Sequence, residues 1–269
     1  MCNGSIMDKL ISFSLPLMVS GILQLAFNAV DIIVVGRFSG SQALAAVGST
    51  TALINVFTNL FIGISLGANV LAARFYAAGK DREMSETVHT SITLALISGI
   101  MMAVIGVLLA KWALEIMGTP DDVIGQSTLY MRIYFMGMPF FMLYNYGAAI
   151  LRAIGDTKRP LIFLIISGIA NAALNMILVI LFHMGVAGVA IGTIISQLIS
   201  CVLVLTCLYR SEGSYQLRFS KLKINGAYME QIFQVGVPAG IQSTVINLSN
   251  ALLQSSVNSF GSIAMAGYT

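Results

Sequence analysis

The first long apolar segment of this chain, residues 10–35, contains a single charged side chain, that of Asp31. A segment of this length and apolarity matches a helix that crosses the hydrocarbon core of a bilayer. A charged carboxylate in that core costs about 2.5–3.5 kcal/mol on insertion scales, so acids inside membranes are rare and usually functional. The segment therefore predicts a membrane helix whose acid has a role in transport.

Polar side chains accompany Asp31 along one face of the same helix. Ser20, Gln24 and Asn28 follow one another at intervals of one helical turn and lead up to the acid. Pro16 lies on this face one turn earlier, where its missing N–H predicts a bend. The alternative is that Asp31 merely reaches water at the membrane surface. The stripe argues against this, because an acid that escapes to water needs no polar neighbours two and three turns away.

The composition indicates an integral membrane protein along the whole chain. Of its 269 residues, 57% are hydrophobic and 9% are charged, whereas a soluble domain carries about 25% charged residues. No basic surface for nucleic acid is visible, so a nucleic-acid partner is not expected. Cys2, Cys201 and Cys207 have neither metal-ligand spacing nor a disulfide pattern.

Apolar length predicts an all-α bundle of membrane helices. Arg37, Lys111 and Arg132 then lie on the outer side, and all other lysines and arginines face the cytoplasm. This bias predicts a cytoplasmic N-terminus and places Asp31 in the outer half of the bilayer. The N-terminal apolar run lacks a cleavage site and is expected to stay as the first helix. The expected spans are about 10–35, 44–73, 88–114, 126–151 (interrupted by Pro139), 161–182, 186–208 and 231–258.

The end of the chain resembles its beginning. Pro238 stands in the seventh segment as Pro16 does in the first, and the later Phe260-Gly261-Ser262 matches Ser39-Gly40-Ser41 with one gap. Chance similarity between two apolar helices is the alternative. A six-helix unit followed by the start of a second is typical of repeat-built transporters. We therefore expect a first lobe at 1–209, a cytoplasmic linker at 210–230 and the start of a second lobe at 231–269.

Other segments carry polar stripes at the same helical spacing. Buried amides must find partners in lipid, so these stripes are expected either to face a wet interior or to hold helices together. The second reading applies to most single asparagines, and Asp31 is what favours a functional site. The stripes comprise Thr51, Asn55 and Asn59; Ser167, Asn171 and Asn175; Thr193 and Gln197; and Ser243, Asn247, Asn250 and Gln254.

Together these residues resemble the multidrug and toxic compound extrusion (MATE) family. The similarity covers essentially the whole chain. It rests on Pro16, Gln24 and Asp31 at the family's spacing, on Gly36 and the run 44–48, on the link 151–158, and on Asn175 with 185–188 and 193–197.

The resemblance implies a two-lobe transporter of twelve helices in an inner (plasma) membrane, with the second lobe missing from this chain. Such a protein exports cationic or amphipathic compounds in exchange for protons or sodium and needs no cofactor. The resemblance makes Asp31, Asn175 and Thr193 the cation site, with sodium as the metal that Asp31 and Asn175 would hold. Gln24 and Tyr134 are expected near the substrate cavity, with Asn28 and Asn171 from the polar stripes, and Pro16 is the expected hinge.

Two departures from the family leave its branch and the coupling ion open. Many members carry an acid four residues after the asparagine, where this chain has Val179, and others carry one in the seventh helix, where 231–258 has none. A flippase of the same superfamily is one alternative, and a seven-helix channel or receptor is another. An enzyme is disfavoured because a lone carboxylate lacks a catalytic partner.

Overall fold

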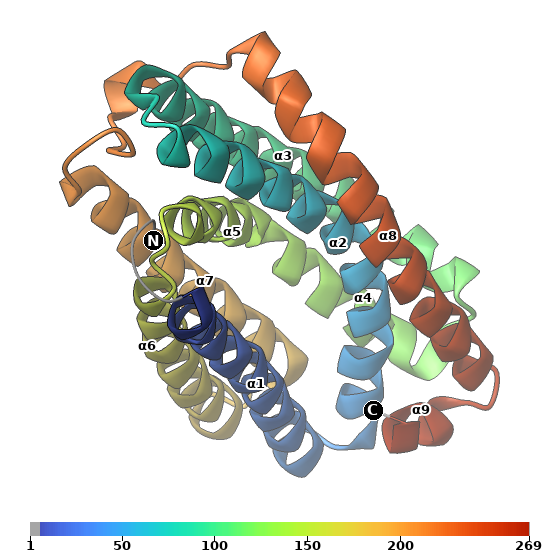
Figure 1. Cartoon of the computed structure of the whole chain (residues 1–269). Helices are drawn as coiled ribbons and strands as arrows, with labels where there is room; N and C mark the ends of the chain where they lie inside the picture. The colour runs from blue at the N-terminus through green and yellow to red at the C-terminus, as the bar shows by residue number, and fades with distance from the viewer. Residues whose placement is uncertain (1–5, 269) are drawn as a thin grey trace.

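The structure, a computed structural model, describes residues 6–268, and the expectations for the N-terminal tail, including Cys2, lie outside this range. Between these limits the chain is helical, without strands. Figure 1 shows the helices packed as a bundle. The helices are α1 Ile6–Phe38, α2 Ser41–Ala77, α3 Asp81–Ile116, α4 Asp121–Met136, α5 Met138–Ala153, α6 Lys158–Met176 with a π-helical turn Ile177–Leu181, α7 Gly185–Arg210, a 3-10 turn Phe219–Lys221, α8 Gly226–Asn258 and α9 Ser262–Tyr268.

Helices occur at all the expected spans, but not all meet the criteria of a membrane crossing. Among residues 6–268, five helices are long and apolar enough to cross a membrane: Leu10–Phe38, Ser41–Ala77, Asp81–Ile116, Lys158–Leu181 and Gly185–Arg210. The fourth span is instead divided into α4 and α5, of 16 residues each. The break at Gly137 follows from Pro139, which has no N–H for the helical ladder and stands in the first turn of α5.

The last long helix begins earlier than its apolar residues suggest. α8 starts at Gly226, not near 231, and the side chain of Asn225 caps it by accepting a hydrogen bond from the Ala227 N–H at 3.1 Å. The segment between α7 and α8 is thus residues 211–225.

The backbone has the same geometry at the two glycines that the sequence comparison aligned, Gly40 and Gly261. Gly40 precedes α2 with φ of 88°, and Gly261 precedes α9 with φ of 89°. L-residues rarely adopt this left-handed conformation, so glycine serves both positions. Each of these glycines follows a long helix with an internal proline, Pro16 in α1 and Pro238 in α8, and the repeat itself stays a prediction.

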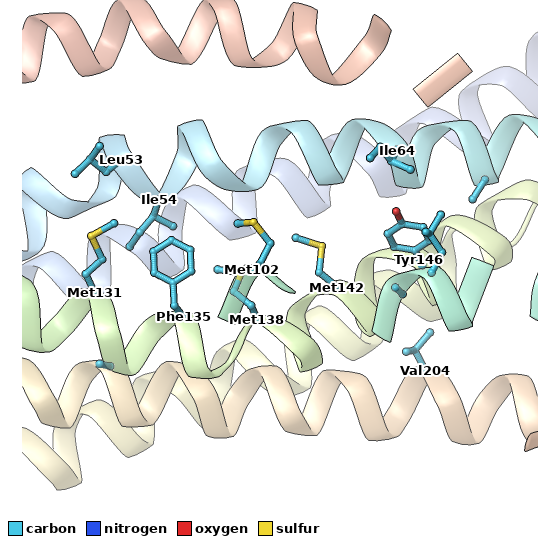
Figure 2. Packing of buried hydrophobic residues seen from close by; sticks show 14 of the residues in the cluster. Leu53, Ile54, Ile64, Met102, Met131, Phe135, Met138, Met142, Tyr146 and Val204 are labelled. Atoms are coloured by element: carbon cyan, nitrogen blue, oxygen red, sulfur yellow. The ribbon is translucent and has the colours of Figure 1, made fainter. Parts of the chain in front are cut away.

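The core of the bundle lies between α2 and the α4–α5 pair. Figure 2 shows Ile54 of α2 beside Phe135 of α4, and Met138 and Met142 of α5 continuing the row. The last three side chains are fully buried. Methionine adapts its shape to irregular gaps, and these methionines fill the space where the α4–α5 axis changes direction.

Helices α2 and α8 pack backbone to backbone along a pair of glycine motifs. Gly63 and Gly67 of α2 face Gly236 and Gly240 of α8, and both pairs have the GxxxG spacing that brings membrane helices together. A Cβ at Gly240 would lie 2.5 Å from the Leu60 carbonyl oxygen. The hydropathy pattern did not predict this contact, although both GxxxG motifs can be seen in the sequence. Figure 1 shows α8 running alongside α2.

Candidate functional site

The acid of α1 meets an amide of α6. Asn175 Nδ2 donates a hydrogen bond of 2.5 Å to Asp31 Oδ1. Asn175 is fully buried and Asp31 is half-buried. The carboxylate therefore faces the bundle and is not simply extended toward the membrane surface. Figure 1 shows α1 running beside α6 and α7, which brings these residues together.

Further hydrogen bonds connect Asn175 of α6 to Thr193 of α7 through Asn171. Asn175 Nδ2 also donates to Asn171 Oδ1 at 3.3 Å. Asn171 Nδ2 donates to Thr193 Oγ1 at 3.5 Å, and the Thr193 hydroxyl donates to the Val189 carbonyl at 2.9 Å. The four-residue spacing of the two asparagines puts them on one face of α6. Asp31, Asn171, Asn175 and Thr193 thus form one hydrogen-bonded group, which we call the Asp31 network.

One fully buried atom of the network lacks a hydrogen-bond partner. Asn175 uses its NH₂ group as donor, while its Oδ1 is buried without a hydrogen bond. Carboxylate, amide and hydroxyl oxygens are ligands that hard cations prefer. Within residues 6–268 no three His, Cys, Asp or Glu residues gather as a metal cluster. The oxygen atoms of the Asp31 network are of the kind that bind a proton or a hard cation.

Two glycines make room for the network. A Cβ at Gly192 of α7 would collide with Asn175 Oδ1, and a Cβ at Gly168 of α6 would collide with the Phe27 ring of α1. The first glycine leaves space for the amide, and the second lets α1 approach α6. From the sequence, Gly192 was expected only to allow close helix packing and Gly168 was not singled out, because nothing in the sequence shows which side chain faces a glycine.

The expected cavity residues divide into two groups. Asn171 belongs to the network, and Tyr134 of α4 is half-buried with its ring centroid 6.1 Å from that of Tyr130. Gln24 and Asn28, by contrast, are exposed on α1 and are not brought to the network.

The expected hinge has a second feature that bends helices. Pro16 lies inside α1 and is buried. One turn later the Ser20 hydroxyl donates to the Pro16 carbonyl at 2.8 Å. A serine that bonds back to the preceding turn tends to bend a helix, as proline does.

An apolar hollow lies between α2 and α8. It has a volume of about 250 Å³ and is open to the surroundings. Its walls are Val56, Phe57, Leu60 and Phe61 from α2 and Ile241, Thr244 and Val245 from α8. Such a surface accepts an apolar group and offers little polar recognition.

A family model named MatE matches residues 16–177 of this chain. The chain belongs to the MatE family. The matched region includes Pro16, Asp31, Asn171 and Asn175, and it ends before Thr193.

Curated relatives extend the similarity over nearly the whole chain. The "Probable multidrug resistance protein YoeA" of Bacillus subtilis is 34% identical over 95% of this chain and 57% of its own length. The "Multidrug export protein MepA" of Staphylococcus haemolyticus is 26% identical over 99% of this chain and 59% of its own length. The chain therefore spans less than two thirds of these relatives.

Solved structures of MATE transporters share the fold. An inward-facing multidrug resistance MATE family transporter of the MOP superfamily gives a TM-score of 0.85 at 21% identity, over 95% of this chain and 59% of that one. An outward-facing structure gives 0.85 at 21% identity, over 92% and 55%. The MatE chain is thus a multi-pass membrane protein with the helical architecture of that family.

Proposed function

We propose that this chain is the ion-coupling part of a secondary antiporter that exports cationic or amphipathic compounds. The observation that carries the proposal is the Asn175–Asp31 hydrogen bond, with a partnerless amide oxygen beside it. Membership in a family whose named relatives are multidrug resistance and export proteins supports it. This membership favours a transporter over the seven-helix receptor and over an enzyme, and no organic cofactor is needed.

The coupling step takes place at Asp31. A proton or sodium ion that binds there removes the negative charge presented to the Asn175 amide and alters the bond that joins α1 to α6. Pro16 and the Ser20 back-bond place the flexible point of α1 four turns earlier. An ion that binds the straight and bent forms of α1 unequally then shifts the balance between two access states.

Residues 1–209 form the first lobe in this proposal, with the N-terminus in the cytoplasm of a plasma membrane. The substrate lies between this lobe and a second one. The apolar hollow between α2 and α8 would take up an apolar part of the compound, and the Asp31 network would attract its charge.

Asp31→Asn tests the ion site. The amide keeps the size of the side chain but cannot carry the charge, so export of a fluorescent cation such as ethidium should fall to background in everted vesicles. Pro16→Ala should also lower export, because α1 loses a bend. The vesicles are energised by a proton gradient or by a sodium gradient in separate experiments, which identifies the ion.

Asp8→Asn is the matched control, because Asp8 is an exposed acid on the same helix. It should export at the wild-type rate. Wild-type export by a correctly inserted Asp31→Asn protein would refute the assignment.

A further inference from the structure

A second, larger hollow lies where the segment 211–225 folds back on the start of α3. Its volume is about 810 Å³. The side chains used below are Arg82, Glu86 and His89 from α3 and Lys221, Lys223 and Asn225 from the segment before α8.

Hydrogen bonds fix the wall of this hollow. The Arg218 N–H donates to His89 Nε2 at 3.1 Å, and the Asn225 N–H donates to Thr90 Oγ1 at 3.2 Å. His89 is buried, with 3% of its surface exposed, and its Nδ1 lies 2.6 Å from the Ser85 carbonyl. The segment is thus attached to α3 at several points and does not hang free.

The charge in the hollow is positive. Glu86 is its single acid, and both carboxylate oxygens are engaged: Oε1 accepts from Arg82 Nε at 3.0 Å and Oε2 accepts from Asn225 Nδ2 at 2.8 Å. Lys221 and Lys223 are exposed, and within residues 6–268 neither has an ion-pair partner. The hollow is therefore lined by two lysines without an ion-pair partner in the described residues, beside the Arg82–Glu86 pair.

Aromatic residues mark the level of the hollow relative to the membrane. Tyr209, at the end of α7, stacks on Phe219 with ring centroids 5.8 Å apart, and both rings are more than half exposed. Exposed aromatic rings at the end of a membrane helix are typical of the headgroup region. Basic pockets at this level attract lipid phosphates.

We propose that this hollow binds a phosphate-bearing anion through Lys221, Lys223 and Arg82. The lysines supply mobile ammonium donors, and the fixed wall positions them on the connection between α7 and α8. The anion is a phospholipid headgroup or free phosphate, and these share the chemistry that the hollow recognises.

The test measures binding and requires no transport. The purified full-length protein is examined by native mass spectrometry with phosphatidylglycerol and with phosphatidylcholine, and by thermal shift with inorganic phosphate. Each lysine near a phosphate surface contributes enough that the double variant Lys221→Gln/Lys223→Gln should bind the anion about 30-fold more weakly. Each single variant should bind about fivefold more weakly, which keeps the test open should the double variant aggregate.

The matched control removes two positive charges elsewhere. Lys111 near the end of α3 and Lys158 at the start of α6 are exposed and do not line the hollow, so Lys111→Gln/Lys158→Gln should bind like the wild type. Phosphatidylglycerol binding that falls in the hollow variants alone supports a headgroup site, and the same pattern with inorganic phosphate supports a free-anion site. Failure to bind either anion, or equal loss in both double variants, overturns the proposal. Neither outcome bears on the antiport proposal, because no ion gradient is used.

Discussion

The amide of Asn175 has an NH₂ group and one oxygen, and the structure engages only the former. The oxygen is buried and lies against Gly192, where a methyl group would occupy its place. Gly192→Ala should therefore displace the amide from Asp31. Overpacking of this kind costs about 1–3 kcal/mol, and if the cost falls on the ion site, apparent ion affinity drops about 5- to 150-fold. The measurement is the dependence of export on proton or sodium concentration.

Gly125→Ala provides the comparison for this prediction. Gly125 is exposed on α4, and a Cβ there meets nothing within 4 Å. Its ion dependence should equal that of the wild type. An unchanged ion affinity in Gly192→Ala would separate the Asn175 amide from ion binding.

At the scale of helices, the contact between α2 and α8 depends on glycine. A Cβ at Gly67 would collide with the Ile232 carbonyl and lie 2.8 Å from the Gly236 nitrogen, and backbone atoms cannot move aside as side chains do. Gly67→Ala should lower the free energy of unfolding by about 1–3 kcal/mol, and so lower the melting temperature in detergent by several degrees. Gly21→Ala on α1 meets nothing within 4 Å and should melt no lower than the wild type. Equal melting of both variants would exclude a structural role for this glycine pair.

The sequence predicts features that depend on one helix alone, but not contacts that form only when several helices pack. Apolar length and Pro139 were enough to place the helices and the α4–α5 break, because lipid requires every backbone group to be paired within its own helix. The start of α8 was missed because Gly226, Tyr228 and Glu230 interrupt the apolar run from which the span was placed. Asp31 came from its place in an apolar segment and Asn171 from a polar stripe, and the family resemblance grouped Asp31 with Asn175 and Thr193. Their hydrogen-bond order, and the space left by Gly192, arise only when α1, α6 and α7 pack.

At the scale of the whole molecule, the positions of the lysines and arginines predict which loops face the cytoplasm. Because cytoplasmic loops of membrane proteins are enriched in lysine and arginine, we predict that the turn at Lys80 lies in the cytoplasm and the start of α4 outside. In a variant whose native cysteines are serine, Asp122→Cys should react with a membrane-impermeant maleimide in intact cells. Lys80→Cys should react only after permeabilisation. Both positions are exposed, so the reverse pattern would mean the opposite orientation.

The glycine contact between α2 and α8 also bears on which parts of the protein can shift. Two helices whose backbones touch along two glycine pairs have no layer of side chains to slide on. In the sequence, α8 comes after the segment 211–225, but in the structure it packs directly against α2. A rearrangement that keeps these four glycines in contact would move α2 and α8 together as one rigid unit. The bending would then occur in α1, where Pro16 removes a backbone hydrogen bond and the Ser20 hydroxyl bonds to the Pro16 carbonyl.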